Sequence, residues 1–121
     1  MQAAFAALPL FGFEKSTGSS STDANIAMSL GIPAICLFPY TDPSKRTEGC
    51  EEAWNPDNLS NAATRAIKDA VPDIAVMTDV ALDPYNSDGH DGIVENGVIV
   101  NDASVEALVK QALSQASAGA D

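Results

Sequence analysis

Basic residues are scarce in this sequence. Six lysines and arginines stand against seventeen aspartates and glutamates in 121 residues, which gives a formal net charge of -11 at pH 7. The six basic residues are scattered, so they form no stripe that could neutralise a nucleic-acid backbone. An anionic membrane surface would repel the chain for the same reason. We therefore expect no nucleic-acid partner.

Cysteine is rare as well, with only Cys36 and Cys50. Two thiols are too few for a disulfide framework, and neither has the spacing of a metal ligand. Cys36 lies in an apolar run, where a buried and inert thiol is the ordinary case. Cys50 lies in the polar stretch T-E-G-C-E-E, whose carboxylates would raise the pKa of a thiol. We interpret both cysteines as structural residues.

Long apolar runs are absent too. No stretch approaches the ~20 residues that a membrane-spanning helix needs. The N-terminus, M-Q-A-A-F-A-A-L-P-L-F-G-F, has no basic residue ahead of its apolar part, unlike a standard signal peptide. The remaining composition, 45% apolar and 19% charged, is typical of one globular domain.

The few phenylalanines are concentrated at one end. Three of the four occur within the first 22 residues, ahead of the flexible stretch S-T-G-S-S-S-T at 16–22. An aromatic peptide on such a tether packs back on the domain, inserts into a partner, or stays a disordered tail. We predict residues 1–22 as an anchor and linker, and residues 23–121 as the folded domain. The anchor residues expected to bind a protein partner are Phe5, Leu8, Leu10, Phe11 and Phe13.

From residue 23 the pattern alternates between helix-like and strand-like segments. A short helix is predicted before Gly31, because glycine is a favoured C-terminal stop. The continuous apolar run I32-P-A-I-C-L-F-P39 suits a strand buried on both faces, and a second such run follows Pro72. The predicted elements are a helix at 23–30, a strand at 32–38, a helix at 58–70 and a strand at 74–80.

The last third of the sequence predicts a hairpin and a helix. Asn96-Gly97 lies between apolar residues and is a strong signal for a tight hairpin turn. Asp102 is predicted to cap a helix at about 103–117. Strand, helix, strand and helix in this order predict right-handed β/α units with a parallel sheet, a slice of a larger barrel. The helix face expected to pack on the domain carries Val105, Leu108, Val109, Ala112, Leu113 and Ala116.

Carboxylates cluster directly after the second predicted strand. The stretch D79-V-A-L-D-P-Y-N-S-D-G-H-D-G92 contains four aspartates, and such a cluster at a strand end is typical of a metal or substrate site. The alternative is a solvated acidic loop. His90 is either a proton shuttle or an exposed residue paired with a carboxylate. Trp54 and Tyr85 either line a pocket or pack under the loop.

Five segments of the sequence carry a resemblance to a known family. They are G31-I-P-A-I-C-L-F-P39, N55-P-D-N-L59, R65-A-I-K-D-A-V-P-D73, T78-D-V-A-L-D-P-Y-N-S-D-G-H-D-G-I-V94, and the last helix, which ends in A118-G-A-D121. In this order and spacing, the residues from about 30 to 121 resemble porphobilinogen synthase (5-aminolevulinate dehydratase), in the aspartate-rich form of plants, algae and many bacteria.

The resemblance implies an α/β fold, a partial (β/α)8 barrel with two parallel strands, a hairpin, three helices and an extended N-terminal segment. It also implies the reaction of the family, which condenses two 5-aminolevulinate molecules into porphobilinogen. Zinc-dependent members have cysteines at the positions of Ala81, Asp83 and Asp91. Carboxylates there favour Mg²⁺ over zinc. Asp83 and Asp91 are thus the expected metal ligands, but with no firmly bound cofactor, because Mg²⁺ relies on substrate and water ligands as well.

The resemblance has a gap at the nucleophile. Family members form Schiff bases with substrate on lysines of later strands, in a segment that would begin beyond Asp121. None of the lysines here is expected at a strand end: Lys15, Lys45, Lys68 and Lys110. No catalytic residue is therefore assigned within this chain. The remnant of one active-site wall is expected to comprise Asp79, Asp83, Ser87 and Asp91.

Three functions follow as hypotheses. The favoured one is a non-catalytic subunit, derived from the synthase, with a structural or binding role in a larger assembly of protein subunits. The plant-like motif indicates a plastid, where the chain would be soluble or peripheral to a membrane complex such as those of photosynthesis. One alternative is porphobilinogen synthase itself, an enzyme of tetrapyrrole biosynthesis, seen as an incomplete chain. The other is a small acidic module that binds a metal or a tetrapyrrole precursor.

Overall fold

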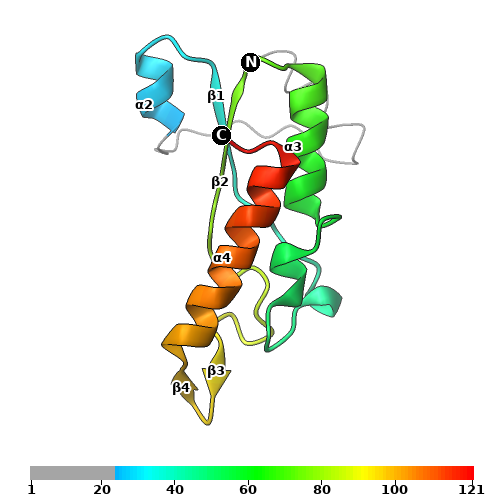
Figure 1. Ribbon diagram of the computed structural model, residues 1–121, viewed down its shortest axis with the longest axis vertical. Helices are drawn as coiled ribbons and strands as arrows, with labels where there is room; N and C mark the ends of the chain where they lie inside the picture. Colours follow the sequence, from blue (N-terminus) through cyan, green and yellow to red (C-terminus); the bar gives the residue numbers. More distant parts are fainter. Residues whose placement is uncertain (1–23) are drawn as a thin grey trace.

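Two parallel strands form the centre of the structure, a computed structural model that describes residues 24–121. β1 (Ala34–Leu37) pairs with β2 (Ala75–Thr78), and Ile35 is the partner of Val76 in the register. Figure 1 shows the two strands side by side. The parallel arrangement confirms the predicted topology. The expected anchor and linker at 1–22 lie outside the described residues.

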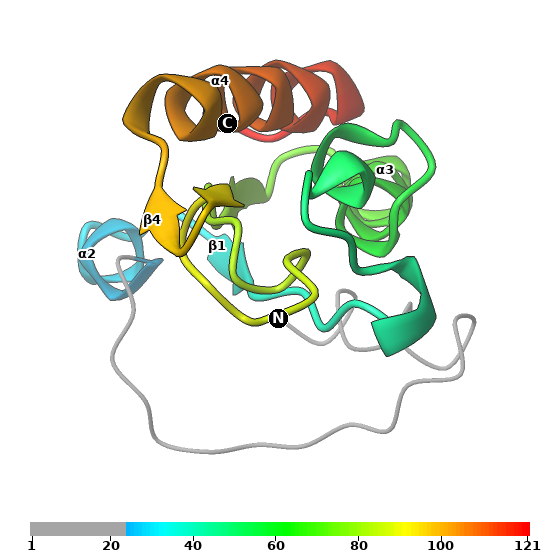
Figure 2. The same cartoon turned by 90° about the horizontal axis from the view of Figure 1, so that it is seen from below.

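Within residues 24–121, three α-helices accompany the strands in the predicted order. α2 (Ala24–Ser29) precedes β1, α3 (Leu59–Ala70) connects β1 with β2, and α4 (Asn101–Ala118) comes last. A hairpin of β3 (Val94–Glu95) and β4 (Val98–Ile99) separates β2 from α4. In Figure 2, α3 and α4 lie next to each other around the strand pair. Two successive β/α units of a barrel have this arrangement.

Two short 3-10 helices shape the loop between β1 and α3. They are η2 (Pro43–Lys45) and η3 (Glu51–Trp54). In the part of the chain that the structure describes, no helix is long and apolar enough to cross a membrane.

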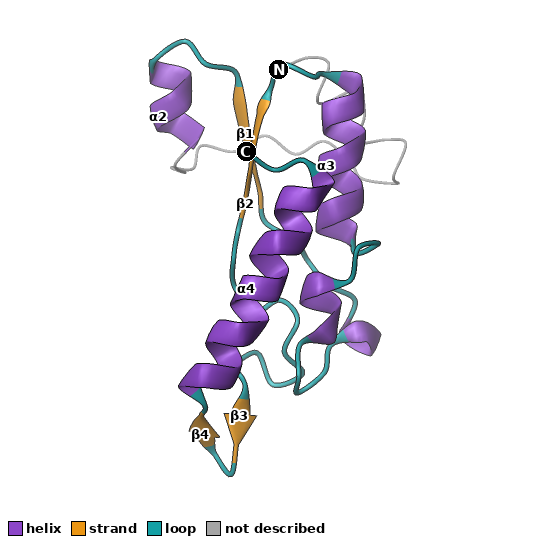
Figure 3. Cartoon of the chain, viewed as in Figure 1, coloured by secondary structure: helices purple, strands orange, loops and turns teal. Residues whose placement is uncertain are grey.

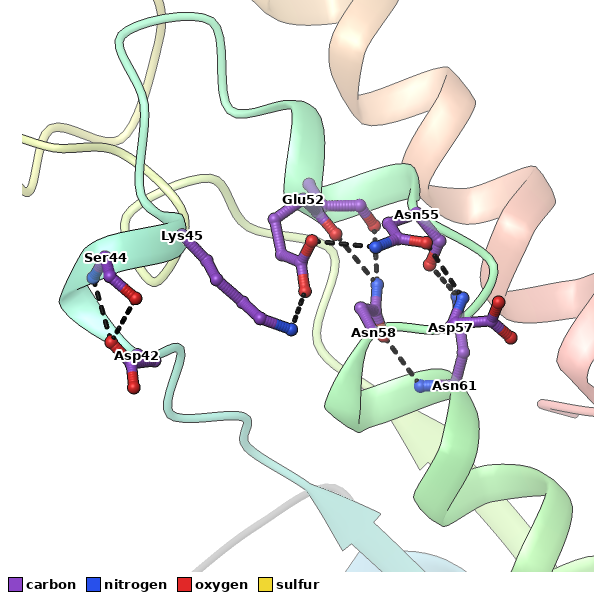
Figure 4. A network of polar contacts seen from close by, with 9 residues as sticks. Asp42, Ser44, Lys45, Glu52, Asn55, Asp57, Asn58 and Asn61 are labelled. Carbon is purple, nitrogen blue, oxygen red and sulfur yellow. Dashed lines mark hydrogen bonds and ion pairs between the residues drawn. The ribbon is translucent and has the colours of Figure 1, made fainter.

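The start of α3 is fixed by Asn58. Its Oδ1 accepts a hydrogen bond from the N–H of Asn61 at 2.8 Å, and its Nδ2 donates to the carbonyls of Glu52 and Ala53 at 3.0 and 3.2 Å. Figure 4 shows this network, in which the side chain of Asn55 also donates to the Glu52 carboxylate at 2.8 Å. A cap that also binds the preceding turn fixes the direction in which α3 leaves the loop.

The start of α4 differs from the prediction. Val100 is the N-cap residue, and no side chain caps this end of the helix, so the expected cap at Asp102 is wrong. Asp102 lies inside the first turn, where a negative charge suits the positive end of the helix dipole. Gly119 has a φ of 104° and ends the helix in the left-handed region that favours glycine.

Only part of the predicted face of α4 packs on the domain. Val105, Val109 and Leu113 are 49%, 52% and 64% exposed. Ala112 and Ala116, from the same predicted face, border a groove of about 290 Å³ beside β2. The buried residues of α4 are instead Ser104, Ala107, Gln111, Gln115 and Ala118. Leu108 of the predicted face packs against the core cluster around Tyr85. The rest of the apolar stripe is exposed or lies beside the sheet edge.

Both strands are less buried than predicted. Every residue of β1, Cys36 included, is half-buried, and in β2 only Val76 is buried. Among the described residues each strand pairs with one other strand, so each has an outer edge that no strand covers. The core under α3 consists of Ile67, Ile74 and Val76. Half-buried faces and edges that no strand covers are what two neighbouring strands cut from a larger sheet would show.

Candidate active-site loop

The loop that follows β2, residues 79–92, carries the four clustered aspartates and is called the acidic loop below. Because β1 and β2 are parallel, the loops that follow them lie at the same end of the strands, as Figure 3 shows. The two loops bond to each other. The N–H of Thr47 donates to the Tyr85 carbonyl, and the N–H of Ser87 donates to the Thr47 carbonyl, both at 3.1 Å. Barrel enzymes place their active sites at this end of the strands.

Two glutamines of α4 hold the start of the acidic loop. Gln115 Nε2 donates to the Asp79 carbonyl at 2.8 Å, and Gln111 Nε2 donates to the Ala81 carbonyl at 3.1 Å. Both glutamines are buried. A carbonyl removed from water needs a donor, since leaving it unpaired costs about 1–3 kcal/mol. These bonds explain why the buried face of α4 is polar.

Asn86 holds the rest of the acidic loop and is only 2% exposed. Its Oδ1 accepts hydrogen bonds from the N–H groups of Asp88 and His90, at 2.8 and 3.3 Å. Its Nδ2 donates to the Gly92 carbonyl at 3.4 Å. One buried amide thus bonds to both sides of the loop.

Sequence reasoning missed these three amide residues. A signal existed for Gln111 and Gln115, because residues four apart share one face of a helix. For Asn86 there was none, since an asparagine between Tyr85 and Ser87 has the appearance of an ordinary loop residue.

The predicted site residues differ in exposure. Asp83, Ser87 and Asp91 are exposed, whereas Asp79 is half-buried. The side chains of Asp83 and Asp91 take part in no hydrogen bond or ion pair within residues 24–121. In that part of the chain no three His, Cys, Asp or Glu side chains are grouped to hold a metal ion. The described residues alone do not form a metal centre, and Mg²⁺ on Asp83 and Asp91 stays a prediction.

The aromatic residues near the acidic loop belong to a core cluster. Tyr85 is 1% exposed, and Trp54 packs against the same cluster. Burial raises the pKa of the Tyr85 hydroxyl to about 12, against the opposing effect of the Gln111 side chain. His90 is exposed, and among residues 24–121 no ion pair joins its ring to a carboxylate. The expected exposure of His90 is confirmed, but the carboxylate partner expected with it is not present within residues 24–121.

Cys50 lies beneath the acidic loop and has no exposed surface. Burial is the main cause that raises the pKa of its thiol, Glu51 adds to it, and the hydrogen bond from Asn86 opposes it. Asn86 Nδ2 lies 3.7 Å from Cys50 Sγ. The predicted direction of the pKa shift is confirmed, although desolvation and not the neighbouring carboxylates is the larger cause.

Each described lysine is paired with a carboxylate. The pairs are Lys45 with Glu52 at 3.0 Å, Lys68 with Asp121 at 2.7 Å, and Lys110 with Glu106 at 2.7 Å. Lys45 and Glu52 also border a cavity of about 400 Å³ between the loop after β1 and the start of α3. Figure 4 shows the Lys45 ammonium directed at the Glu52 carboxylate.

Comparison with known proteins places the chain in a family. The family model described as delta-aminolevulinic acid dehydratase matches residues 7–121. The chain belongs to the delta-aminolevulinic acid dehydratase family. The match begins nearer the N-terminus than the resemblance from about residue 30 indicates, so it includes part of the predicted anchor and linker. The division into an anchor at 1–22 and a domain at 23–121 stays a prediction.

Three named dehydratases show how similar the relatives are. The Rhodobacter capsulatus protein is 60% identical over 83 residues, which are 69% of this chain and 25% of that protein. The Bradyrhizobium diazoefficiens protein is 58% identical over 99 residues, 82% of this chain and 28% of that protein. The chloroplastic protein of Chlamydomonas reinhardtii is 54% identical over 94 residues, 77% of this chain and 24% of that protein. This chain spans about a quarter of the length of these relatives.

A solved structure confirms the fold class. The delta-aminolevulinic acid dehydratase (porphobilinogen synthase) of Toxoplasma gondii, in complex with the reaction product porphobilinogen, matches with a TM-score of 0.73 and 48% identity. The match covers 82% of this chain and 29% of that chain. The two parallel strands and three helices are thus part of a barrel of this family.

These findings overturn the favoured functional hypothesis. The relatives are named as dehydratases, bacterial ones among them, and not as non-catalytic subunits of a plastid assembly. The expected accessory role in photosynthesis is therefore wrong, and the alternative, porphobilinogen synthase, is favoured. The error arose because the absence of lysine-bearing strands was interpreted as loss of function. The position at which a sequence ends carries no information about catalysis.

Proposed function

We propose that this chain supplies one side of the barrel and part of the active site of a delta-aminolevulinic acid dehydratase. The observation that carries the proposal is the position of the acidic loop. It lies inside the segment that the family model matches, and it follows β2 at the C-terminal end of a parallel pair. Barrel enzymes carry their chemistry at that end. The whole enzyme would convert 5-aminolevulinate into porphobilinogen, the product bound in the Toxoplasma gondii structure.

The carboxylates of the acidic loop are available to a ligand. Asp83 and Asp91 are exposed, and no other side chain of residues 24–121 bonds to them. An unpaired carboxylate can accept hydrogen bonds from a substrate ammonium group or supply an oxygen ligand to a hard cation. We assign no step to a metal, because the described residues do not group three ligands. The acidic loop is proposed to bind and orient substrate.

The nucleophile is proposed to come from the barrel outside residues 24–121. Schiff-base chemistry needs an amine with a lowered pKa at a desolvated strand end. Lys68 and Lys110 lie on helices, and Lys45 ends η2, so none meets this requirement. The division of labour is therefore binding by this segment and covalent chemistry by another.

A chimeric enzyme tests the proposal. The 83 residues of the Rhodobacter capsulatus dehydratase that align with this chain would be replaced by the corresponding residues of this chain. We expect kcat/KM for porphobilinogen formation within about tenfold of the parent enzyme, a change of 1.4 kcal/mol or less in transition-state stabilisation. A chimera that folds with the Tm of the parent yet forms no porphobilinogen would contradict the proposal.

A matched pair of variants locates the activity in the loop. In the chimera, Asp83→Asn together with Asp91→Asn removes both free carboxylates and should lower kcat/KM by about 100-fold or more. Glu95→Gln removes an exposed carboxylate of the hairpin and should leave kcat/KM unchanged. Because the double variant removes two charges and Glu95→Gln removes one, equal effects per removed charge would assign the loss to net charge and not to the site.

Two further proposals concern the cellular location of the chain and its protein partner. Plant and algal relatives are named chloroplastic, which supports a plastid location, although the bacterial relatives do not require it. Fractionation of the source cells with an antibody to this chain would decide the location.

The protein partner proposed for Phe5, Leu8, Leu10, Phe11 and Phe13 can be tested by deleting residues 1–15. Unchanged co-purification of partners after the deletion would exclude the anchor.

A further inference from the structure

The contacts of Asn86 are unusual for a loop residue. Its side chain is buried, and both of its polar atoms bond to the backbone of the acidic loop. Its own N–H also donates to the Leu82 carbonyl at 2.9 Å. Asn86 therefore closes the loop from Leu82 to Gly92 around one side chain. It also bonds to Cys50 Sγ, and so joins this loop to the loop after β1.

Asp91 lies between two of the groups that Asn86 binds. The N–H of His90 donates to Asn86 Oδ1, and the carbonyl of Gly92 accepts from Asn86 Nδ2. The backbone is thus held on each side of Asp91, whereas the Asp91 side chain is exposed. This arrangement fixes the backbone position from which the Asp91 side chain extends, while its carboxylate oxygens remain available to a ligand.

Gly92 holds the same segment against α4. A Cβ at this position would lie 2.7 Å from Ile99 Cγ2 and 2.8 Å from Ser104 Oγ, so only glycine fits without a shift of neighbours. The next residue, Ile93, donates its N–H to Ser104 Oγ at 2.9 Å. The C-terminal end of the acidic loop is therefore packed on α4. The hydrogen bond from Asn86 to the Gly92 carbonyl connects the remainder of the loop to this packed end.

We propose that Asn86 is a positioning residue, which holds the acidic loop in the shape that presents Asp83 and Asp91 to a ligand. The inference rests on the proposed function of this loop as an active-site wall. Asn86 itself touches no reacting atom. Its hydrogen bonds restrict the loop backbone before a ligand arrives, so that binding itself has less backbone freedom to restrict. An amide suits this role, because it combines an acceptor for the N–H groups of Asp88 and His90 with a donor for the Gly92 carbonyl.

Amide hydrogen exchange of the 121-residue chain tests the positioning without reference to activity. Asn86→Ala removes the acceptor of two amides, so the exchange rates of the Asp88 and His90 N–H groups should rise about 5- to 100-fold. Asn101→Ala is the matched control, since the side chain of Asn101 is exposed and bonds only to Asp102. Unchanged exchange at Asp88 and His90 in Asn86→Ala would overturn the proposal.

A conservative variant separates the two halves of the amide. Asn86→Asp keeps an oxygen acceptor for Asp88 and His90 but has no donor for the Gly92 carbonyl. Protection of the two amides should therefore be retained, while the Ile93 N–H, one residue beyond Gly92, should exchange faster. If the Ile93 N–H stays as protected in Asn86→Asp as in the unsubstituted chain, the bond to the Gly92 carbonyl does not hold the loop and the proposal fails.

Kinetics in the chimeric enzyme distinguish positioning from stability. Asn86→Ala should raise KM for 5-aminolevulinate about 5- to 100-fold, the ratio that corresponds to one or two lost loop bonds, and should change kcat less. Ile67→Ala is the destabilising control, because Ile67 is a buried residue of α3 that packs on Ile74 and Val76 and not on the acidic loop. A residue with a merely structural role would behave as Ile67→Ala does, with a lower Tm and an unchanged KM. An inactive unsubstituted chimera would contradict the proposed function, whereas the exchange experiment would still decide the role of Asn86.

Discussion

Asp121 is bonded to Val76 of β2 through two hydrogen bonds. The N–H of Asp121 donates to the Val76 carbonyl at 3.0 Å, and the N–H of Val76 donates to Asp121 Oδ2 at 2.9 Å. Lys68 of α3 donates to the same carboxylate oxygen at 2.7 Å and to the Ile74 carbonyl at 3.0 Å. One backbone and one side-chain hydrogen bond thus join Asp121, which lies beyond α4 and Gly119, to the outer edge of β2.

The Asp121 bonds predict a pH-dependent contribution to stability. The hydrogen bond from Lys68, and after it that from the Val76 N–H, lowers the pKa of the Asp121 carboxyl from its ordinary value. A lowered pKa in the folded state stabilises the fold above the unfolded pKa of about 3.9, and this contribution is lost as the pH falls through the folded pKa. The Asp121 side chain is 51% exposed, so the contribution should stay below about 1 kcal/mol.

Urea unfolding at pH 7 and at pH 2 measures that contribution. Asp121→Asn should lower the free energy of unfolding at pH 7, and this deficit should shrink toward pH 2, because protonation of the native carboxyl removes the stabilised charge. Glu95→Gln, an exposed carboxylate in the hairpin, is the control and should show no difference at either pH. A deficit of Asp121→Asn that is as large at pH 2 as at pH 7 would contradict the assigned pKa direction.

The two faces of α4 predict opposite outcomes for polar and apolar substitutions. Gln115→Ala removes the donor of the Asp79 carbonyl and should cost about 1–3 kcal/mol of unfolding free energy. Leu113→Ala, on the 64% exposed stripe, should cost less than about 0.5 kcal/mol in the 121-residue chain. Equilibrium urea unfolding compares the two. A larger loss for Leu113→Ala would restore the apolar stripe as the packing face.

Sequence reasoning predicted the local parts of this fold and missed the long-range ones. The hairpin turn is a local property: Asn96 and Gly97 have φ values of 51° and 77°, which few other residue pairs tolerate. The parallel strands follow from apolar runs and from the helix between them. The packing face of α4 does not, because Gln111 and Gln115 bind carbonyls about 30 residues away along the chain.

For the acidic loop too, the sequence predicts the local features and misses the long-range contacts. That a carboxylate cluster follows β2 is visible in the sequence, and so is the resemblance that identifies the family. The means by which the loop is held is not visible, since Asn86 bonds to Cys50 across 36 positions of sequence. Hydropathy also ranks the apolar stripe of α4 as core, although Val105, Val109 and Leu113 of that stripe are exposed.

Burial of Cys50 predicts a slow thiol whose reactivity depends on Asn86. Desolvation raises the pKa of Cys50, so less thiolate is present near pH 8 than in a free thiol, and the sulfur has no exposed surface. With Cys36→Ala as the background, labelling by a thiol-specific disulfide reagent should be limited by opening of the loop. Asn86→Ala should accelerate it about 5- to 100-fold, in proportion to the exchange of the Asp88 amide. If Cys50 is labelled as fast as a model thiol in the Cys36→Ala background that retains Asn86, this result would contradict the burial of Cys50.

The ion-paired lysines predict where a substrate imine does not form. Borohydride reduction in the presence of 5-aminolevulinate traps a Schiff base as a stable adduct, which peptide mass spectrometry can locate. In the 121-residue chain we expect no stoichiometric adduct, because Lys45, Lys68 and Lys110 each hold a carboxylate partner at 2.7 to 3.0 Å and none ends a strand. In the chimera the adduct should map to a lysine of the Rhodobacter capsulatus portion. A stoichiometric adduct on Lys45, which borders the cavity beside α3, would instead place covalent chemistry within this segment and contradict the proposed division between binding and catalysis.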